Sequence, residues 1–237
     1  MTGRRGVLAA LGSIAAVGQG PALAQAAAAA SAASAPVLKA LGGERYQVGR
    51  IVVDKKARSV TVPGRVQARD KPLEFLATSP GARKAYESLL ELDASGTEFN
   101  LACILAGFER DPAVPLSRPL STANAVGQRV DLWVAWGAAG QQRRISAAEA
   151  LLGAEAVAQG KLIEWAYTGS FTSKDGSQLA ADVTGTLVSF VKKDPTGVIE
   201  IAAAVDLGPY GGVRGNELLP PEGGAIALIV EAGKAPK

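Results

Sequence analysis

The sequence predicts an α+β fold, a single domain built mainly of antiparallel β-sheet with about two packed helices. Short runs rich in Val and Ile recur between turn-forming residues, which is the pattern of strands joined by tight connections. Only two segments carry a clear helical pattern, too few to cross over between all the strands of a doubly wound parallel sheet. Hydrophobic residues make up 48% of the 237 residues, which is enough to form a buried core.

Residues 1–24 are predicted to be a signal peptide, and residues 25–44 an Ala/Ser-rich flexible spacer. Arg4 and Arg5 precede an apolar run of about 12 residues, and Ala22-Leu-Ala24 offers a small-x-small cleavage site. That run is too short to span a membrane, and no longer apolar run follows, so we expect no transmembrane segment. The paired arginines also fit the twin-arginine route, which leaves both export routes open. The mature chain is therefore expected to be periplasmic or secreted.

The charge balance argues against nucleic-acid binding. The chain has 25 Lys and Arg against 22 Asp and Glu, a net charge of +3 that falls to +1 when the two arginines of residues 1–24 are removed. The basic pairs are short and scattered, whereas tracking a phosphate backbone requires a basic stripe or patch. We expect no nucleic acid among the partners.

The predicted globular domain runs from residue 45 to residue 233 and begins with strands. Residues 50–54 and 59–63 are β-branched runs that flank a short polar turn, which indicates a hairpin. Residues 73–77 and 86–92 are predicted to be the next two strands. Further along the chain, strands are predicted at residues 130–136, 162–167, 183–190, 198–202 and 225–230.

Two helices are predicted between these strands. The first covers residues 97–107, where apolar residues recur at helical spacing and Gly107 ends the helix. The second begins at Ser146, because Ser146 and Glu149 have the spacing of a capping box. It is expected to end near Gly153.

The residue inventory excludes several kinds of catalytic site. The chain has no histidine, which removes the Ser-His-Asp triad and histidine-ligated zinc. Its single cysteine, Cys103, lies in the apolar stretch of the first predicted helix and is expected to pack as a small hydrophobic residue. We therefore predict no catalytic residue, no metal site and no cofactor.

Two acidic features leave alternatives open. Glu74 and Glu87 lie in apolar strand contexts and form either structural ion pairs or the carboxylate pair of a glycoside hydrolase. Residues 93–98 resemble a short oxygen-ligand loop but lack the alternating acids of an EF-hand. Asp93 and Ser95 are instead expected to form the turn and cap of the following helix.

The order of several segments resembles the YdjY-domain family of exported bacterial proteins. The resemblance covers about residues 45–232. It is carried by Ile51-Val-Val-Asp54, Val60-Thr-Val-Pro63-Gly64, Leu73-Glu74-Phe75, Lys84-Ala-Tyr86-Glu87-Ser88-Leu89, Trp165-Ala-Tyr-Thr-Gly169-Ser170, Ala181-Asp182-Val-Thr-Gly185, Asp194-Pro195 and Asn216-Glu-Leu-Leu-Pro220.

The resemblance implies little about chemistry. The family has no assigned activity, although some members are described as ferredoxin-like or occur with iron–sulfur components. Because a cluster needs four cysteine ligands and this chain has only Cys103, an electron-carrier role would not apply here. The family often has histidine at the position of Tyr86, which puts any ligand or base at that position in doubt. The candidate ligand-binding residues are Lys84, Tyr86, Glu87, Ser88, Trp165, Ser170 and Asn216.

These observations favour an exported, soluble and non-enzymatic envelope module that binds a partner protein or a small polar ligand. One alternative is a carboxylate-dependent hydrolase or lyase that acts on an envelope glycan through Glu87 and Glu74. Another is an accessory subunit of an exported redox complex, without a cluster of its own.

Overall fold

The computed structural model describes residues 36–115, 125–138, 140–152, 158–160, 163–173, 175–190, 196–204 and 213–233. The predicted signal peptide lies outside these residues. The described strands are β1 (Leu38–Gly42), β2 (Arg45–Val48), β3 (Ile51–Asp54), β4 (Ser59–Val66), β5 (Phe75–Thr78), β6 (Ser88–Leu92), β7 (Gln128–Trp136), β8 (Arg143–Ser146), β9 (Ile163–Tyr167), β10 (Thr186–Ser189), β11 (Ile199–Ala204) and β12 (Ala225–Ala232). The described helices are the 3₁₀ turn η1 (Ala85–Glu87), α1 (Gly96–Leu105), α2 (Ala147–Leu152) and α4 (Ala180–Thr184).

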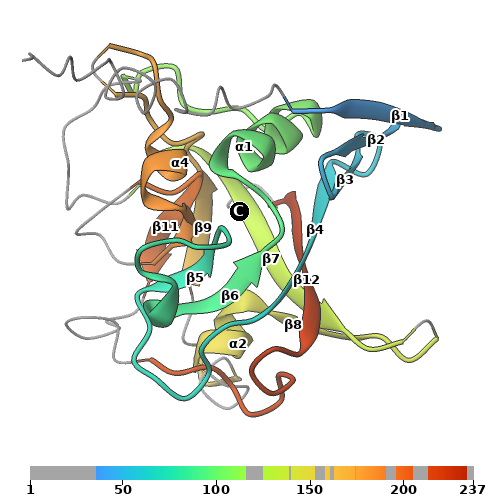
Figure 1. The fold of residues 1–237 in the computed structure, drawn as a ribbon, viewed down its shortest axis with the longest axis vertical. Coiled ribbons are helices and arrows are strands. Elements are labelled where there is room, and N and C mark those ends of the chain that lie inside the picture. The colour runs from blue at the N-terminus through green and yellow to red at the C-terminus, as the bar shows by residue number, and fades with distance from the viewer. Residues whose placement is uncertain are drawn as a thin grey trace, which may run out of the picture. The chain divides into compact units, whose positions relative to one another are not determined.

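Eight strands close into a barrel in the order β4, β12, β7, β9, β11, β10, β5 and β6, with β6 pairing back onto β4 (Figure 1). The β10–β11 and β5–β6 pairs are parallel, and the other pairs around the ring are antiparallel. Strands β1, β2 and β3 extend outward from one end of β4, and β8 pairs with β7.

The predicted α+β class is wrong, because the described chain is a closed, mostly β barrel with three short α-helices. Local patterning identifies strands but does not show whether the two edges of a sheet meet. Here β3 pairs with only the first half of β4, up to Thr61. The free edge beyond it, from Gly64 to Val66, takes up β6 and completes the ring.

Most of the predicted elements are confirmed in place. The hairpin of β3 and β4 and the predicted first and second helices are present as α1 and α2, and α2 is described to Leu152. The predicted end of α2 at Gly153 lies outside the described residues. Strands β1, β2 and β8 were not predicted, and β1 lies within the stretch expected to be spacer.

Two predicted strands are only partly correct. In the stretch 86–92 the first two residues belong to the turn η1, and the strand begins at Ser88. In the stretch 183–190 the first two residues belong to α4, and the strand begins at Thr186. The β-branched Val183 and Thr184 favour a strand locally, whereas the glycine that follows them is a common helix stop.

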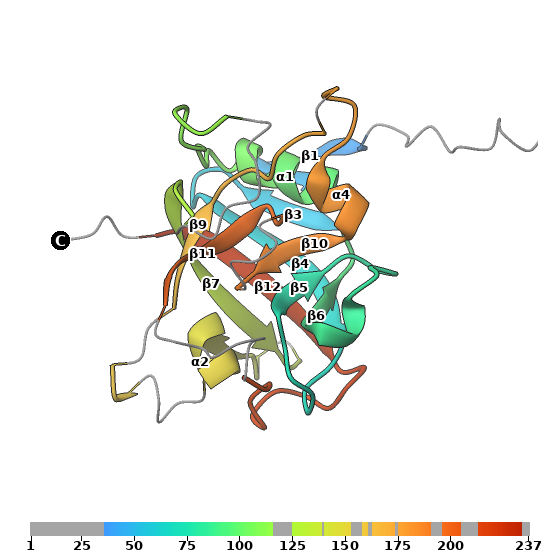
Figure 2. The same ribbon diagram turned by 90° about the vertical axis from the view of Figure 1, so that its left-hand side faces the viewer.

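The core consists mainly of aliphatic side chains from the barrel strands and one face of α1, which contributes Phe99, Ala102 and Cys103. In both ribbon views α1 and α2 lie at opposite sides of the barrel (Figures 1 and 2). Helix α1 packs against β3 and α4. None of the described helices has the length and apolar character to cross a membrane.

Candidate functional site

The Lys84 ammonium joins two of the predicted acidic residues into one cluster. Its Nζ lies 2.9 Å from Glu74 Oε2 and 3.6 Å from Glu87 Oε2, and 5.5 Å from the centre of the Phe75 ring. The strands bring them together, since the Glu74 amide donates to the Glu87 carbonyl where β5 begins to pair with β6. The hydrogen bond to Glu74 is the main cause that raises the pKa of Lys84. Lys84 therefore keeps its positive charge at neutral pH and loses its proton only as pH rises through that raised pKa.

Tyr86 and Ser88, which flank Glu87 in the predicted site, differ in exposure. Tyr86 is 56% exposed on the turn η1. Ser88 is fully buried, and its hydroxyl donates to the Leu90 carbonyl at 2.9 Å. Trp165, on β9, is buried in the barrel core. Buried side chains of this kind stabilise the fold and leave little surface for a ligand.

Ser170 and Asn216 each hold a loop against a helix. The Ser170 hydroxyl donates to the Thr196 carbonyl at 2.8 Å and accepts from the first turn of α4. The Asn216 side-chain amide donates to the Glu149 carbonyl of α2 at 3.0 Å. Lys84 and Glu87 are thus brought together, whereas Ser170 and Asn216 bond with segments on α4 and α2.

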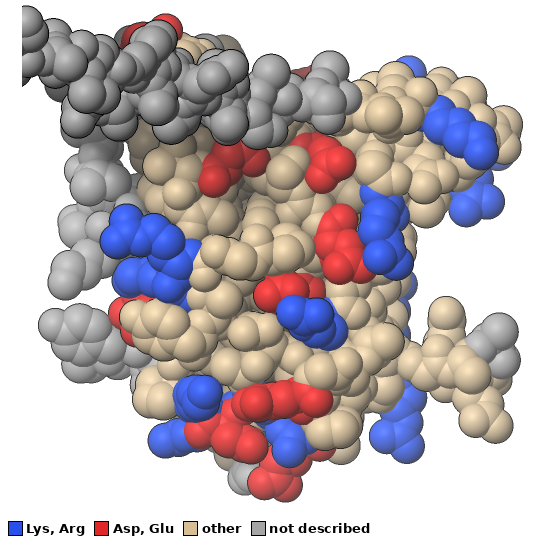
Figure 3. All heavy atoms as spheres, viewed as in Figure 1, with Lys and Arg blue, Asp and Glu red and all other residues tan. Residues whose placement is uncertain are grey.

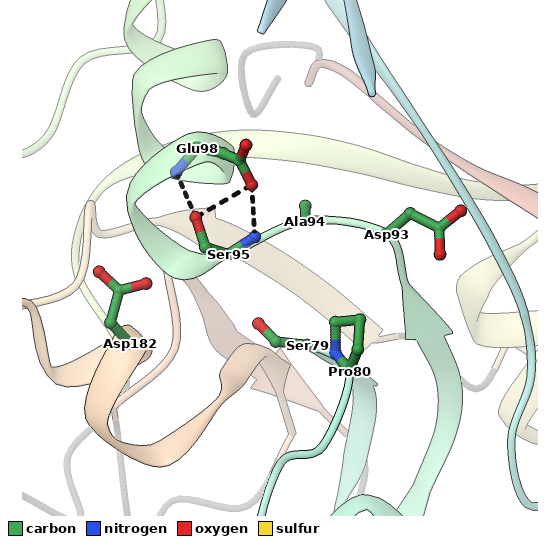
Figure 4. A pocket seen from close by; sticks show the side chains of 7 residues that line it. All are labelled: Ser79, Pro80, Asp93, Ala94, Ser95, Glu98 and Asp182. Carbon is green, nitrogen blue, oxygen red and sulfur yellow. Dashed lines mark hydrogen bonds between the residues drawn. The ribbon is translucent and has the colours of Figure 1, made fainter. Parts of the chain in front are cut away.

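An open hollow of about 390 Å³ lies at the start of α1 (Figure 4). It is lined by Ser79, Pro80, Asp93, Ala94, Ser95, Glu98 and Asp182. The predicted cap is confirmed here. The Ser95 hydroxyl accepts from the Glu98 amide, and the Glu98 carboxylate accepts from the Ser95 amide, which together form a capping box.

Each of the three carboxylates around this hollow already has a structural partner. Asp182 lies on α4 and accepts from the amide of Thr97 at 3.0 Å and from the hydroxyl of the same residue. Its negative charge therefore faces the positive end of the α1 helix dipole. Asp93 pairs with Arg50 at 3.2 Å. Among the residues that the structure describes, no group of three or more His, Cys, Asp or Glu is arranged to hold a metal ion.

Two buried acids were missed by the sequence prediction. Glu91 on β6 is 7% exposed and pairs with Arg65 across the β4–β6 seam at 2.6 Å. Glu200 on β11 is 2% exposed and accepts from the Gly197 amide at 2.6 Å. Both stand alone in apolar strand sequences, the same signal that singled out Glu74 and Glu87.

Cys103 is expected to be chemically silent in the folded chain. It is fully buried, and burial raises the pKa of its thiol above the ordinary value of 9.0. Burial raises the pKa of Tyr167 above 10.0 in the same way. Since only the unfolded chain then ionises in alkali, stability should fall by about 1.4 kcal/mol per pH unit for each group above its ordinary pKa.

Thiol labelling and alkaline unfolding measure this directly. We expect a water-soluble disulfide reagent to modify native Cys103 only at the rate of unfolding. Between pH 9 and pH 10, the ordinary pKa values of the thiol and of Tyr167, we expect the free energy of unfolding to fall less steeply in Cys103→Ala than in the parent chain. Fast labelling of the native chain, or an unchanged slope in the variant, would contradict the burial of this thiol.

The most exposed apolar side chains of the described N-terminal part lie outside the barrel, on what we call the arm, residues 37–58. All five residues of β1 are exposed, and the exposed fractions are 76% for Val37, 51% for Leu38 and 41% for Leu41. The arm projects to the upper right in Figure 1, and basic side chains are visible on it in Figure 3.

A family model described as the YdjY domain matches residues 51–231. Neither a curated protein nor a solved structure matches the chain.

Proposed function

The chain belongs to the YdjY domain family, and from its geometry we propose that it is an exported, non-enzymatic module of the cell envelope that binds a partner protein. The family description names no activity, so the proposal rests on this chain's own residues. Residues 1–24 supply the reason to expect export.

The observation that carries the proposal is strand β1. It pairs with β2 along one side, and in the part of the chain that the structure describes no strand pairs with its other side. Exposed strand edges with apolar side chains are common places for another chain to add, and they cause aggregation when left uncovered. A partner protein that covers β1 accounts for its exposure.

The two carboxylates proposed for catalysis share one cation. Glu74 is hydrogen-bonded to Lys84 at 2.9 Å, and Glu87 lies 3.6 Å from the same ammonium, which is the arrangement of a structural ion-pair cluster. Glu98 and Asp182 cap α1 from the side of the hollow.

Site-specific photocrosslinking in cells that export the chain tests the proposal. A photoreactive residue at Leu41 on the arm should give one adduct of defined size, in a chain that has lost its signal peptide. The matched control positions are Ile104 on α1 and Val183 on α4, which are 54% and 59% exposed and should give none. An uncleaved, unexported chain, or the absence of a discrete adduct at Leu41, would overturn the proposal.

The non-enzymatic part has its own test. Purified chain is incubated with envelope glycan, and released sugars are measured for the parent and for Glu87→Gln. We expect no release from either protein. Release by the parent that Glu87→Gln abolishes would establish the carboxylate enzyme instead.

A further inference from the structure

We propose that the partner segment is an extended strand in which apolar residues alternate with acidic ones, and that it adds to the free side of β1. This inference rests on the proposed function and specifies the chemistry of the partner. Addition of a strand to a sheet edge draws its affinity from backbone hydrogen bonds and its specificity from alternate side chains.

The backbone of β1 is prepared for such an addition. Antiparallel pairing with β2 aligns Leu38 with Val48, Lys39 with Gln47 and Ala40 with Tyr46. In a strand paired on one side, backbone N–H and C=O groups on the other side are available to an added strand. The arm is also held in shape, since β2 continues through β3 into the barrel strand β4.

One face of the arm is apolar and continues to its free side. Residues paired directly across strands share a face, so Leu38 and Ala40 lie on the same face as Val48 and Tyr46. Val48 is fully buried, whereas Leu38 at the outer strand is 51% exposed. The apolar face therefore runs past the last strand, and every second residue of an added strand would cover it.

The opposite face of the arm carries its basic residue nearest the free side, Lys39, which lies beside Gln47. Arg45 lies two residues before Gln47 on the same face, and Asp54 of β3 is paired across from Arg45. Neither Lys39 nor Arg45 forms an ion pair with another residue that the structure describes. The arm as a whole has six Lys and Arg against two acids, and of the six Arg50 pairs with Asp93, whereas the mature chain is nearly neutral. The remaining alternate residues of the partner are therefore expected to be acidic.

The same charges disfavour a second copy of the chain as the occupant. Two arms joined along β1 would bring two basic faces into one sheet, with Lys39 of each copy near the junction. Like charges on neighbouring strands destabilise the pairing, whereas opposite charges stabilise it. The basic side chains of the arm attract an acidic strand, whereas they repel a second copy of the arm.

The test uses the full mature chain and three fluorescent nonapeptides. In the first peptide valine alternates with glutamate, in the second valine alternates with lysine, and the third has the composition of the first with its valines in one block. We expect the first peptide to bind about tenfold more tightly than either of the others by fluorescence anisotropy at about 0.15 M salt, where distant charges are screened. Hydrogen exchange should slow at β1 amides when that peptide is added.

A charge reversal on the arm and a matched reversal elsewhere decide the outcome. Lys39→Glu should weaken binding of the valine–glutamate peptide about tenfold and favour the valine–lysine peptide. Arg143→Glu, the same charge change on the exposed strand β8, should leave binding within about twofold, because surface charges far from a contact act weakly through salt.

Three results would overturn the proposal that an acidic strand adds to β1. The first is equal binding of the three peptides, and the second is binding that Lys39→Glu does not change. The third is a dimer in light scattering whose β1 amides are protected from hydrogen exchange without any peptide. If Leu41 crosslinks a partner in cells while the peptides fail, the proposed function stands and the partner chemistry is wrong. If Leu41 also gives no adduct, both fail.

Discussion

Replacing Gly64 by alanine is expected to destabilise the folded chain by about 3 kcal/mol or more, because it forces open the seam that closes the barrel. A Cβ at Gly64 would overlap the backbone carbonyl oxygen of Glu91 and lie 2.9 Å from Leu92 Cα. Both obstacles are backbone atoms of β6, so no side-chain rotation relieves them. Either β6 moves away from β4, or the strands remain paired under strain.

Denaturant unfolding measures the loss, and hydrogen exchange locates it. Exchange should accelerate at the amides of β6, which pairs with Gly64 through Val66. Gly81→Ala is the control, since an added Cβ there meets nothing within 4 Å. Its φ of +72° costs an alanine about 1–2 kcal/mol, so the difference between the variants isolates the seam. Equal losses in the two variants would show that the seam tolerates a side chain.

Gly64 also shows why the strands were predictable and the barrel was not. Strands β3, β4, β7 and β12 have β-branched or alternating residues that identify them locally, and each is present. Closure depends on the fit between Gly64 and the backbone of β6, which belongs to a distant segment. No local pattern distinguishes a glycine that allows this approach from one that serves a turn.

The candidate site divides in the same way. Lys84 and Glu87 are three residues apart, and their proximity follows from the sequence, whereas Glu74 joins them only through the pairing of β5 with β6. The capping box of Ser95 and Glu98 was predictable because both partners lie within one turn. Its second cap, Asp182, comes from α4 and needed the tertiary fold.

The arm was the least predictable part of the molecule. Strand β1 has the sequence LKALG, which lacks β-branched residues and follows an Ala/Ser-rich stretch. It forms a strand because β2 offers a neighbouring edge, and such pairing overrides weak local preference. The spacer predicted from composition for residues 25–44 therefore includes β1, which tertiary pairing with β2 makes a strand.

Phe99→Ala is expected to cost about 3–5 kcal/mol, since it empties a fully enclosed volume where α1 packs into the core. Phe99 is completely buried, together with Ala102 and Cys103 on the same helix. The small neighbours on α1 have little freedom to fill the space. Because the helix is tied at its start to both Ser95 and Asp182, it is also poorly placed to shift inward. The free energy of unfolding from denaturant titration gives the loss.

Ile104→Ala on the same helix separates packing from helix propensity. Ile104 is 54% exposed, so its truncation should change stability by no more than about 0.5 kcal/mol. Alanine is the better helix former at both sites, and any common gain in propensity cancels in the comparison. A large gap between the two variants means that α1 is held through its buried face. A gap below about 1 kcal/mol would mean that the capping contacts carry the helix, since a cap is worth about that much.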